Sequence, residues 1–177
     1  MIGVLILVEV IILFFLVMLF VFLGLPLLFT GAPFIPSYRR ARHQILAPLF
    51  EIAKKAPGNK FVDLGSGDAR VVIEFAQHGF ESTGVEYNPF LVWWSRIKIK
   101  KLNIKHQNAK IIRANFWHVD LSSFDIVFIF QLNYVNALLA EKFKKELKTG
   151  ALIISAGFPM FGFELIKREG IFWVYRN

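Results

Sequence analysis

Residues 61–70 read Phe61-Val62-Asp63-Leu64-Gly65-Ser66-Gly67-Asp68-Ala69-Arg70. The apolar start predicts a β-strand, and the two glycines predict a tight turn that leads into a helix. Glycine adopts a positive φ at little cost and lets a ligand approach the backbone, so Gly65 and Gly67 suit a ligand-binding turn. Asp63 stands at the end of the strand, where its carboxylate can fix the turn or meet a cation. An ordinary glycine-rich turn is the alternative, because Gly-x-Gly alone is a weak motif.

A second acidic residue, Glu86, ends the next strand pattern and is followed by Tyr87-Asn88-Pro89. The number of residues that separate Glu86 from Gly65 and Gly67 along the sequence is the number expected of a carboxylate that binds ribose hydroxyls. Dinucleotide folds usually carry a third glycine, but here that position is Arg70. The arrangement Asp-x-Gly-x-Gly without a third glycine resembles motif I of class I S-adenosylmethionine (SAM) methyltransferases. This comparison favours SAM over NAD as the cofactor.

The composition sets limits on the function. The chain has 177 residues, enough for one domain of modest size and an appendage. Residues 2–29 carry one charge, Glu9, and the rest of the chain is strongly basic, which suits nucleic acid, anionic lipid or an acidic protein partner. The absence of cysteine excludes disulfides, thiolate zinc sites and cysteine nucleophiles. The four histidines show no ligand spacing, so no metal is predicted.

The N-terminal segment is predicted to be a transmembrane helix. Residues 2–23 are long and apolar enough to cross a bilayer, and the absence of an early basic residue argues against a cleaved signal peptide. Arg39 and Arg40 follow the span and nothing basic precedes it, so the positive-inside rule places the C-terminal domain on the cytoplasmic side of the membrane. We expect a membrane helix over residues 1–29, a proline-containing linker and helix over 30–58, and a SAM-binding domain over 59–177.

From Lys60 onward, strand patterns alternate with helix patterns, as in a parallel sheet with helices on its faces. The last two strand patterns, residues 163–167 and 172–176, are separated by a turn too short for a crossover helix and therefore predict an antiparallel hairpin. The predicted fold is α/β and Rossmann-like, with a mainly parallel sheet that ends in this hairpin. The basic residues at the end of the second of these helices, from Lys98 to Lys105, are interpreted as a solvated helix end, with contact to lipid or substrate as the alternative.

The sequence resembles membrane-anchored class I methyltransferases. The resemblance is to the lysine methyltransferases of the mitochondrial ATP synthase c-subunit and adenine nucleotide translocase, and to archaeal protein lysine methyltransferases. It covers about residues 33–175 and rests on Pro33-Phe34-Ile35-Pro36, the residue 62–70 turn, residues 84–89, Asn115-Phe116-Trp117 and residues 147–158. Two positions depart from the pattern. Ala69 replaces the usual glycine, and Asn115 replaces an acid that commonly accepts a hydrogen bond from the adenine amino group. The amide oxygen of Asn115 can still accept this hydrogen bond.

The resemblance implies methyl transfer from SAM to a lysine amine. It assigns cofactor binding to Asp63, Gly65, Ser66, Gly67, Glu86, Tyr87, Asn115 and Phe116. Phe34, Tyr38 and Phe158, with Phe116 and Trp117, are the aromatic residues we place around the substrate channel, and packing is the alternative role for each of them.

The implied partners are a membrane lipid bilayer and a membrane-protein substrate. A nucleic-acid substrate is disfavoured, because Gln131-Leu132-Asn133 replaces the Asp/Asn-Pro-Pro-aromatic element of amino-directed nucleic-acid methyltransferases. Methylation of a small molecule or lipid, and SAM binding without catalysis, stay open as alternatives.

Overall fold

The structure, a computed structural model, describes residues 2–21, 42–104 and 108–177. It divides the chain into two units, residues 1–36 and 37–177. The predicted linker motif Pro33–Pro36 and the predicted channel residues Phe34 and Tyr38 lie outside the described residues.

The first unit contains helix α1, Ile2–Leu19, whose described side chains from Ile6 onward are exposed. Within the part of the chain that the structure describes, no helix has both the length and the apolar character needed to cross a membrane. The predicted span over residues 2–23 is therefore not supported, and neither is the single-pass topology derived from it.

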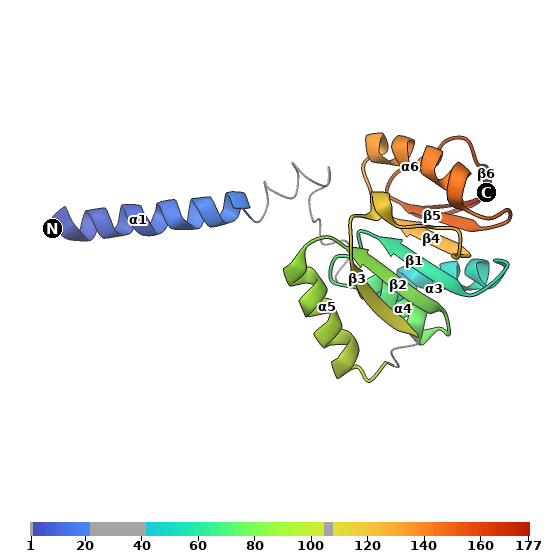
Figure 1. The fold of residues 1–177 in the computed structure, drawn as a ribbon, viewed down its shortest axis with the longest axis horizontal. Coiled ribbons are helices and arrows are strands. Elements are labelled where there is room, and N and C mark those ends of the chain that lie inside the picture. Colours follow the sequence, from blue (N-terminus) through green and yellow to red (C-terminus); the bar gives the residue numbers. More distant parts are fainter. Residues whose placement is uncertain (1, 22–41, 105–107) are drawn as a thin grey trace. The chain divides into compact units, whose positions relative to one another are not determined.

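The second unit is built on a seven-stranded sheet in the order β3-β2-β1-β4-β5-β7-β6 (Figure 1). The strands are β1 (Lys60–Leu64), β2 (Glu81–Glu86), β3 (Ala109–Arg113), β4 (Ile126–Ile129), β5 (Leu152–Ala156), β6 (Glu164–Glu169) and β7 (Phe172–Arg176). The first five pair in parallel, while β7 runs antiparallel to both β5 and β6. The predicted mainly parallel sheet with a C-terminal antiparallel hairpin is confirmed.

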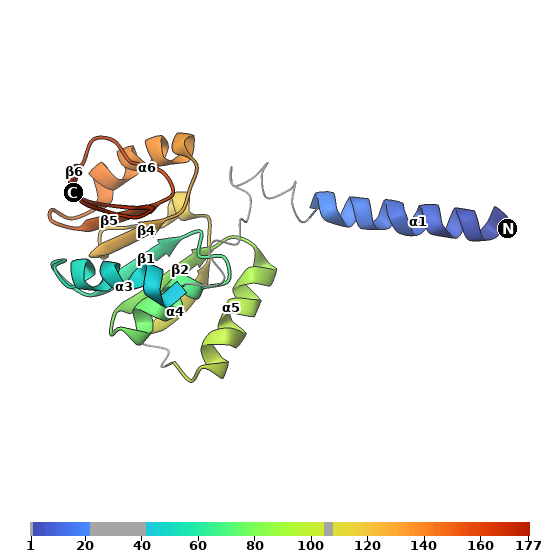
Figure 2. The same ribbon diagram turned by 180° about the vertical axis from the view of Figure 1, so that it is seen from behind.

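Helices cover both faces of this sheet, since alternate strand residues point to opposite sides. The helices are α3 (Arg42–Ala53), α4 (Arg70–Gln77), α5 (Pro89–Lys101), α6 (Asn133–Glu146) and the short 3₁₀ turn η2 (Phe116–His118). α3 and α4 pack on the face that carries Phe61 and Phe128. Figure 2 shows both helices in front of the sheet. α6 packs on the face that carries Val62 and Val127, and α5 packs against α4 and β3.

The strand order brings the carboxyl ends of β1, β2, β4 and β5 to one edge of the sheet. β1 lies between β2 and β4. The chain adds β2 and β3 on one side of β1 and then returns to add β4 and β5 on the other side. Ligands of open α/β sheets bind outside the carboxyl ends of the strands at such a switch point. The fold therefore directs attention to the loop that follows Leu64.

Candidate functional site

The loop between β1 and α4 needs its glycines. Gly65 has φ 89° and Gly67 has φ 54°, values in the left-handed region. A Cβ atom on Gly65 would also lie 2.8 Å from Nε2 of Gln131. Ala69 has φ 60° as the N-cap of α4, so the position at which the related pattern carries glycine does adopt a conformation that favours glycine.

The backbone N–H groups of this loop point into the protein. Gly65 and Ser66 both donate to the carbonyl oxygen of Val85, at 2.9 and 3.0 Å. Gly67 donates to Oε2 of Glu86 at 2.9 Å. A pyrophosphate site needs such N–H groups to face the ligand. Because all three are used internally, the loop is unsuited to a dinucleotide pyrophosphate, in agreement with the preference for SAM.

Glu86 connects the ends of β1 and β2. Beside the bond from Gly67, its Oε1 accepts from the backbone N–H of Asn88 at 2.7 Å. Asn88 in turn caps α5, because its side chain accepts from the N–H groups of Phe90 and Leu91. Burial raises the pKa of Glu86, and hydrogen bonds from backbone N–H groups oppose this shift. A carboxylate has about four acceptor positions, so a position beyond those used by the backbone N–H groups stays available for a ribose hydroxyl.

Asp63 is a buried carboxyl group next to two other acids. It is 4% exposed, and no described residue donates a hydrogen bond to it. Burial raises the pKa of Asp63 to about 8, and the charges of Glu86 and Asp68 add to the shift. An acid with such a pKa is largely neutral at pH 7, and a cation that binds beside it lowers this pKa and favours the ionised form. The position thus suits a positively charged ligand and disfavours an anionic one.

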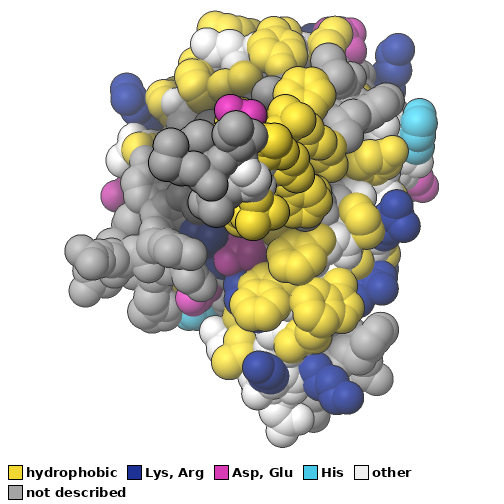
Figure 3. All heavy atoms as spheres, turned by 90° about the vertical axis from the view of Figure 1, so that its left-hand side faces the viewer, with side chains coloured by type: hydrophobic (Ala, Val, Ile, Leu, Met, Phe, Trp, Pro, Cys, Tyr) yellow, Lys and Arg dark blue, Asp and Glu magenta, His cyan; other side chains and the backbone are white. Residues whose placement is uncertain are grey.

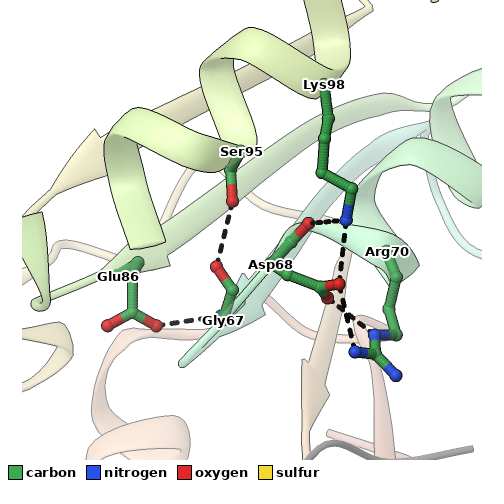
Figure 4. A network of polar contacts seen from close by, with 6 residues as sticks. All are labelled: Gly67, Asp68, Arg70, Glu86, Ser95 and Lys98. Atoms are coloured by element: carbon green, nitrogen blue, oxygen red, sulfur yellow. Dashed lines mark hydrogen bonds and ion pairs between the residues drawn. The ribbon is translucent and has the colours of Figure 1, made fainter. Parts of the chain in front are cut away.

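Asp68 is held by a cluster of contacts that fixes the far end of the loop (Figure 4). Its carboxylate accepts from Nε of Arg70 at 2.6 Å and from Nζ of Lys98 at 2.8 Å, and Lys98 also donates to its carbonyl oxygen. Burial acts to raise the pKa of Asp68, but the hydrogen bonds and charges of Arg70 and Lys98 prevail and lower it. Ser95 donates to the carbonyl oxygen of Gly67 at 3.0 Å, so α5 clamps the loop at two points.

This cluster corrects the interpretation of Lys98 as part of a solvated helix end. We expect Lys98→Met to lower the free energy of unfolding by about 1 to 2 kcal/mol, because a charge-assisted bond is lost. Lys100→Met is the matched control, since Lys100 is exposed and makes no ion pair among the described residues.

Urea unfolding at several pH values measures this effect. A lowered pKa of Asp68 stabilises the fold above the ordinary aspartate value near 4, and the contribution disappears as the pH falls through the folded-state value. The difference between parent and Lys98→Met should therefore shrink at acid pH. A difference that is independent of pH would contradict the ion pair.

Two buried polar atoms at this edge of the sheet have no hydrogen-bond partner in the described structure. They are Oγ of Ser66 and Oε1 of Gln131. Gln131 follows β4 and donates from Nε2 to the carbonyl oxygen of Leu64 at 3.2 Å, which fixes its amide beside the loop. Buried unpaired acceptors are costly in a finished core and fit a site whose ligand supplies the missing donors. Such donors are the ammonium and hydroxyl groups of SAM.

A polar network lies at the neighbouring end of β5. Ser155 donates to the carbonyl oxygen of Phe158 at 2.6 Å, and Nδ2 of Asn136 contacts Oγ of Ser155 at 3.2 Å. Oδ1 of Asn136 is buried and unpaired within the described residues. This network fixes the backbone of the predicted channel residue Phe158. Ser155, Asn136 and Gln131 were not among the predicted site residues. A usable signal was that Gln131 follows β4, Asn136 lies in the first turn of the next helix α6, and Ser155 lies near the carboxyl end of β5.

Three other residues were predicted to bind the cofactor, and the structure places them differently. Oδ1 of Asn115 accepts from the backbone N–H of Trp117 at 3.1 Å and caps η2, so the atom assigned to adenine already has one donor. Phe116 is buried in the cluster beneath α6 and packs against Trp117, which indicates a packing role. Tyr87, next to Glu86, is 47% exposed and its ring is accessible to a ligand.

Comparison with known proteins gives a consistent result. A family model described as the ANTKMT methyltransferase domain matches residues 63–167. The lysine N-methyltransferase of the ATP synthase c-subunit from Mus musculus is 34% identical over 127 residues, which are 72% of this chain and 49% of that protein. A protein-lysine N-methyltransferase of Saccharolobus islandicus is 33% identical over 142 residues, 77% of this chain and 85% of that protein.

A solved structure supports the fold and the cofactor. The RNA methyltransferase of Salinibacter ruber in complex with S-adenosyl-L-homocysteine has a TM-score of 0.65 at 27% identity, covering 80% of this chain and 92% of that chain. Together with the family match, this likeness confirms the predicted methyltransferase fold and SAM as the cofactor. The chain spans about half the length of the mouse relative that it matches.

Proposed function

The chain belongs to the ANTKMT methyltransferase domain family, and on this premise we propose that it is a SAM-dependent protein-lysine N-methyltransferase. The observation that carries the proposal is the acidic loop after β1, which has its N–H groups turned inward and three carboxyl groups nearby, from Asp63, Asp68 and Glu86. Such a loop suits a cationic ligand. The names of the two lysine methyltransferase relatives supply the acceptor.

When bound, SAM supplies a methyl group on a positively charged sulfur, which an amine accepts in one in-line displacement that leaves S-adenosylhomocysteine. The protein groups then have to position two partners and exclude water. Glu86 would hold the ribose hydroxyls, and Asp63, Ser66 and Gln131 would surround the cationic methionine end. The acceptor lysine has an ordinary pKa of about 10.4, so desolvation beside aromatic side chains such as Phe158 favours the neutral amine that reacts.

The exposed helix α1 supports a further part of the proposal, association with a membrane. From Ile6 to Leu19 its described side chains are exposed and, apart from Glu9, apolar. A helix that is apolar on all sides is stable when another apolar phase covers it. Confinement to a bilayer would raise the effective concentration of targets in the same membrane.

Labelling with methyl-labelled SAM tests the function. The purified full-length protein is incubated with membranes, and label is counted separately in proteins, lipids and RNA, with mass spectrometry of the labelled peptides. We expect label on lysine, and far less label at low SAM concentration with the Glu86→Ala variant, because its affinity for the cofactor is lowered. Label in lipid alone or in RNA alone would replace the lysine proposal, and binding of S-adenosylhomocysteine without any label would indicate a non-catalytic SAM-binding module.

A second arm of the same experiment tests membrane association. The enzyme and its target are placed either in the same vesicles or in separate vesicles that are then mixed. Faster labelling in shared vesicles is expected from confinement. Equal rates in both arrangements would remove the membrane from the proposal and leave the chemistry untouched.

A further inference from the structure

Helix α5 exposes a row of large aromatic side chains. Its buried side consists of Val92, Ser95 and Ile99, and its opposite side presents Phe90, Trp93 and Trp94, which are 54%, 55% and 42% exposed. The rings form a continuous group, with centroids 5.8 Å apart for Phe90 and Trp93 and 6.4 Å apart for Trp93 and Trp94. In the lower part of Figure 3, at the height of α5 in Figure 1, hydrophobic side chains gather beside lysine and arginine side chains. Large exposed apolar patches mark interaction sites on soluble domains.

The chain segment that contains this aromatic row is basic. Residues 87–119 contain seven lysines and arginines and no aspartate or glutamate. Lys100 and Lys101 lie on the last turn of α5, exposed and without an ion pair among the described residues. The neighbouring strand β3 adds the exposed side chains of Lys110 and Arg113, and Arg96 ties α5 to this strand through the carbonyl oxygen of Ile111.

The combination identifies one kind of partner. Tryptophan and phenylalanine beside lysine are the residue types that enter the interface between headgroups and acyl chains, and clustered lysines are attracted to anionic headgroups. We propose that the outer face of α5, defined by Phe90, Trp93, Trp94, Lys100 and Lys101, docks the methyltransferase domain on an anionic lipid bilayer. The proposal concerns the folded domain itself and is independent of α1 and of methyl transfer.

Docking through α5 would have a consequence for the site. α5 begins directly after Asn88, whose side chain caps the helix and whose N–H binds Glu86. The exposed ring of Tyr87 lies at the same end. A bilayer that contacts α5 would therefore lie beside the mouth of the cofactor site and favour acceptor groups close to the lipid surface.

The tryptophans allow a direct test in the full-length protein. All four lie in the second unit, at positions 93, 94, 117 and 173, so none reports on α1. The protein is mixed with vesicles of equal parts phosphatidylcholine and phosphatidylglycerol, whose acyl chains are either brominated or not. We expect brominated lipid to quench the parent, and the variant Trp93→Phe with Trp94→Phe to lose this quenching. The variant Trp117→Phe with Trp173→Phe should keep it.

Charge variants test the basic part of the face. Replacing Lys100 and Lys101 by glutamine should weaken docking about 25-fold, about fivefold for each lysine, and added salt should weaken docking of the parent. Replacing Lys144 and Lys145 on α6 removes the same charge from another exposed surface and should change nothing. The proposal is overturned if the parent binds the vesicles without quenching, if the Trp93/Trp94 variant is quenched equally, or if the aromatic face instead mediates self-association.

Discussion

Replacing Asp63 by asparagine is expected to make the free protein more stable and at the same time to weaken cofactor binding at least tenfold. The reason is that the fold keeps a carboxyl group in a place that disfavours its charge. Asp63 is buried at the end of β1, and burial together with Glu86 and Asp68 raises its pKa to about 8. Asparagine has the same shape and never needs to ionise, so it fits the free protein better.

The sign of the pH dependence follows from the raised pKa. In the unfolded chain Asp63 loses its proton near pH 4, whereas in the folded protein it keeps the proton up to about pH 8. The folded state therefore binds more protons between these values, and the stability of the parent falls as the pH rises from 4 to 8. We expect asparagine to gain about 2 to 4 kcal/mol at pH 8.

Cofactor binding should depend on pH in the opposite direction. A carboxylate formed at Asp63 would pair with the cationic end of SAM, so binding by the parent should release a proton and strengthen as the pH rises toward 8. Asparagine removes both effects. Calorimetry in buffers of different ionisation enthalpy measures the released proton. Equal affinity of parent and variant at every pH would show that Asp63 serves the loop alone.

Replacing Glu86 by alanine is expected to lower the affinity for S-adenosylhomocysteine about 100-fold or more. Such a loss corresponds to about 3 kcal/mol and is the size expected when a charge-assisted bidentate contact to the ribose disappears. Loss of Glu86 also has a structural effect. Glu86 accepts from the N–H groups of Gly67 and Asn88, so its loss leaves both donors without their acceptor.

The variant Glu86→Gln separates the two roles. One amide oxygen can still accept from either Gly67 or Asn88, so we expect a smaller loss of stability than the roughly 1 to 2 kcal/mol of alanine. The negative charge is lost in both variants, and affinity should fall in both. Urea unfolding and calorimetry measure the two quantities, with Glu81→Gln, an exposed residue on the same strand, as the control. Unchanged affinity in Glu86→Ala would exclude the ribose role.

Local patterns were enough to predict the architecture of the second unit. Two glycines with an apolar run before them and a helical pattern after them predict strand, turn and helix, because backbone preferences are a property of neighbouring residues. The short turn at Glu169 and Gly170 likewise left only an antiparallel hairpin, which the structure confirms. For the first unit, length and hydropathy predicted a membrane span, but among the described residues no helix meets the requirements for one.

The chemistry of the site was decided by contacts between residues far apart in the chain. The raised pKa of Asp63 depends on Glu86, the clamp on Asp68 depends on Lys98, and Gln131 reaches the loop from the end of β4. The sequence places each of these residues at a strand end or on a helix, but it does not give distances between them. Only the packing of parallel strands brings their carboxyl ends to one edge, where burial and charge then act on each side chain.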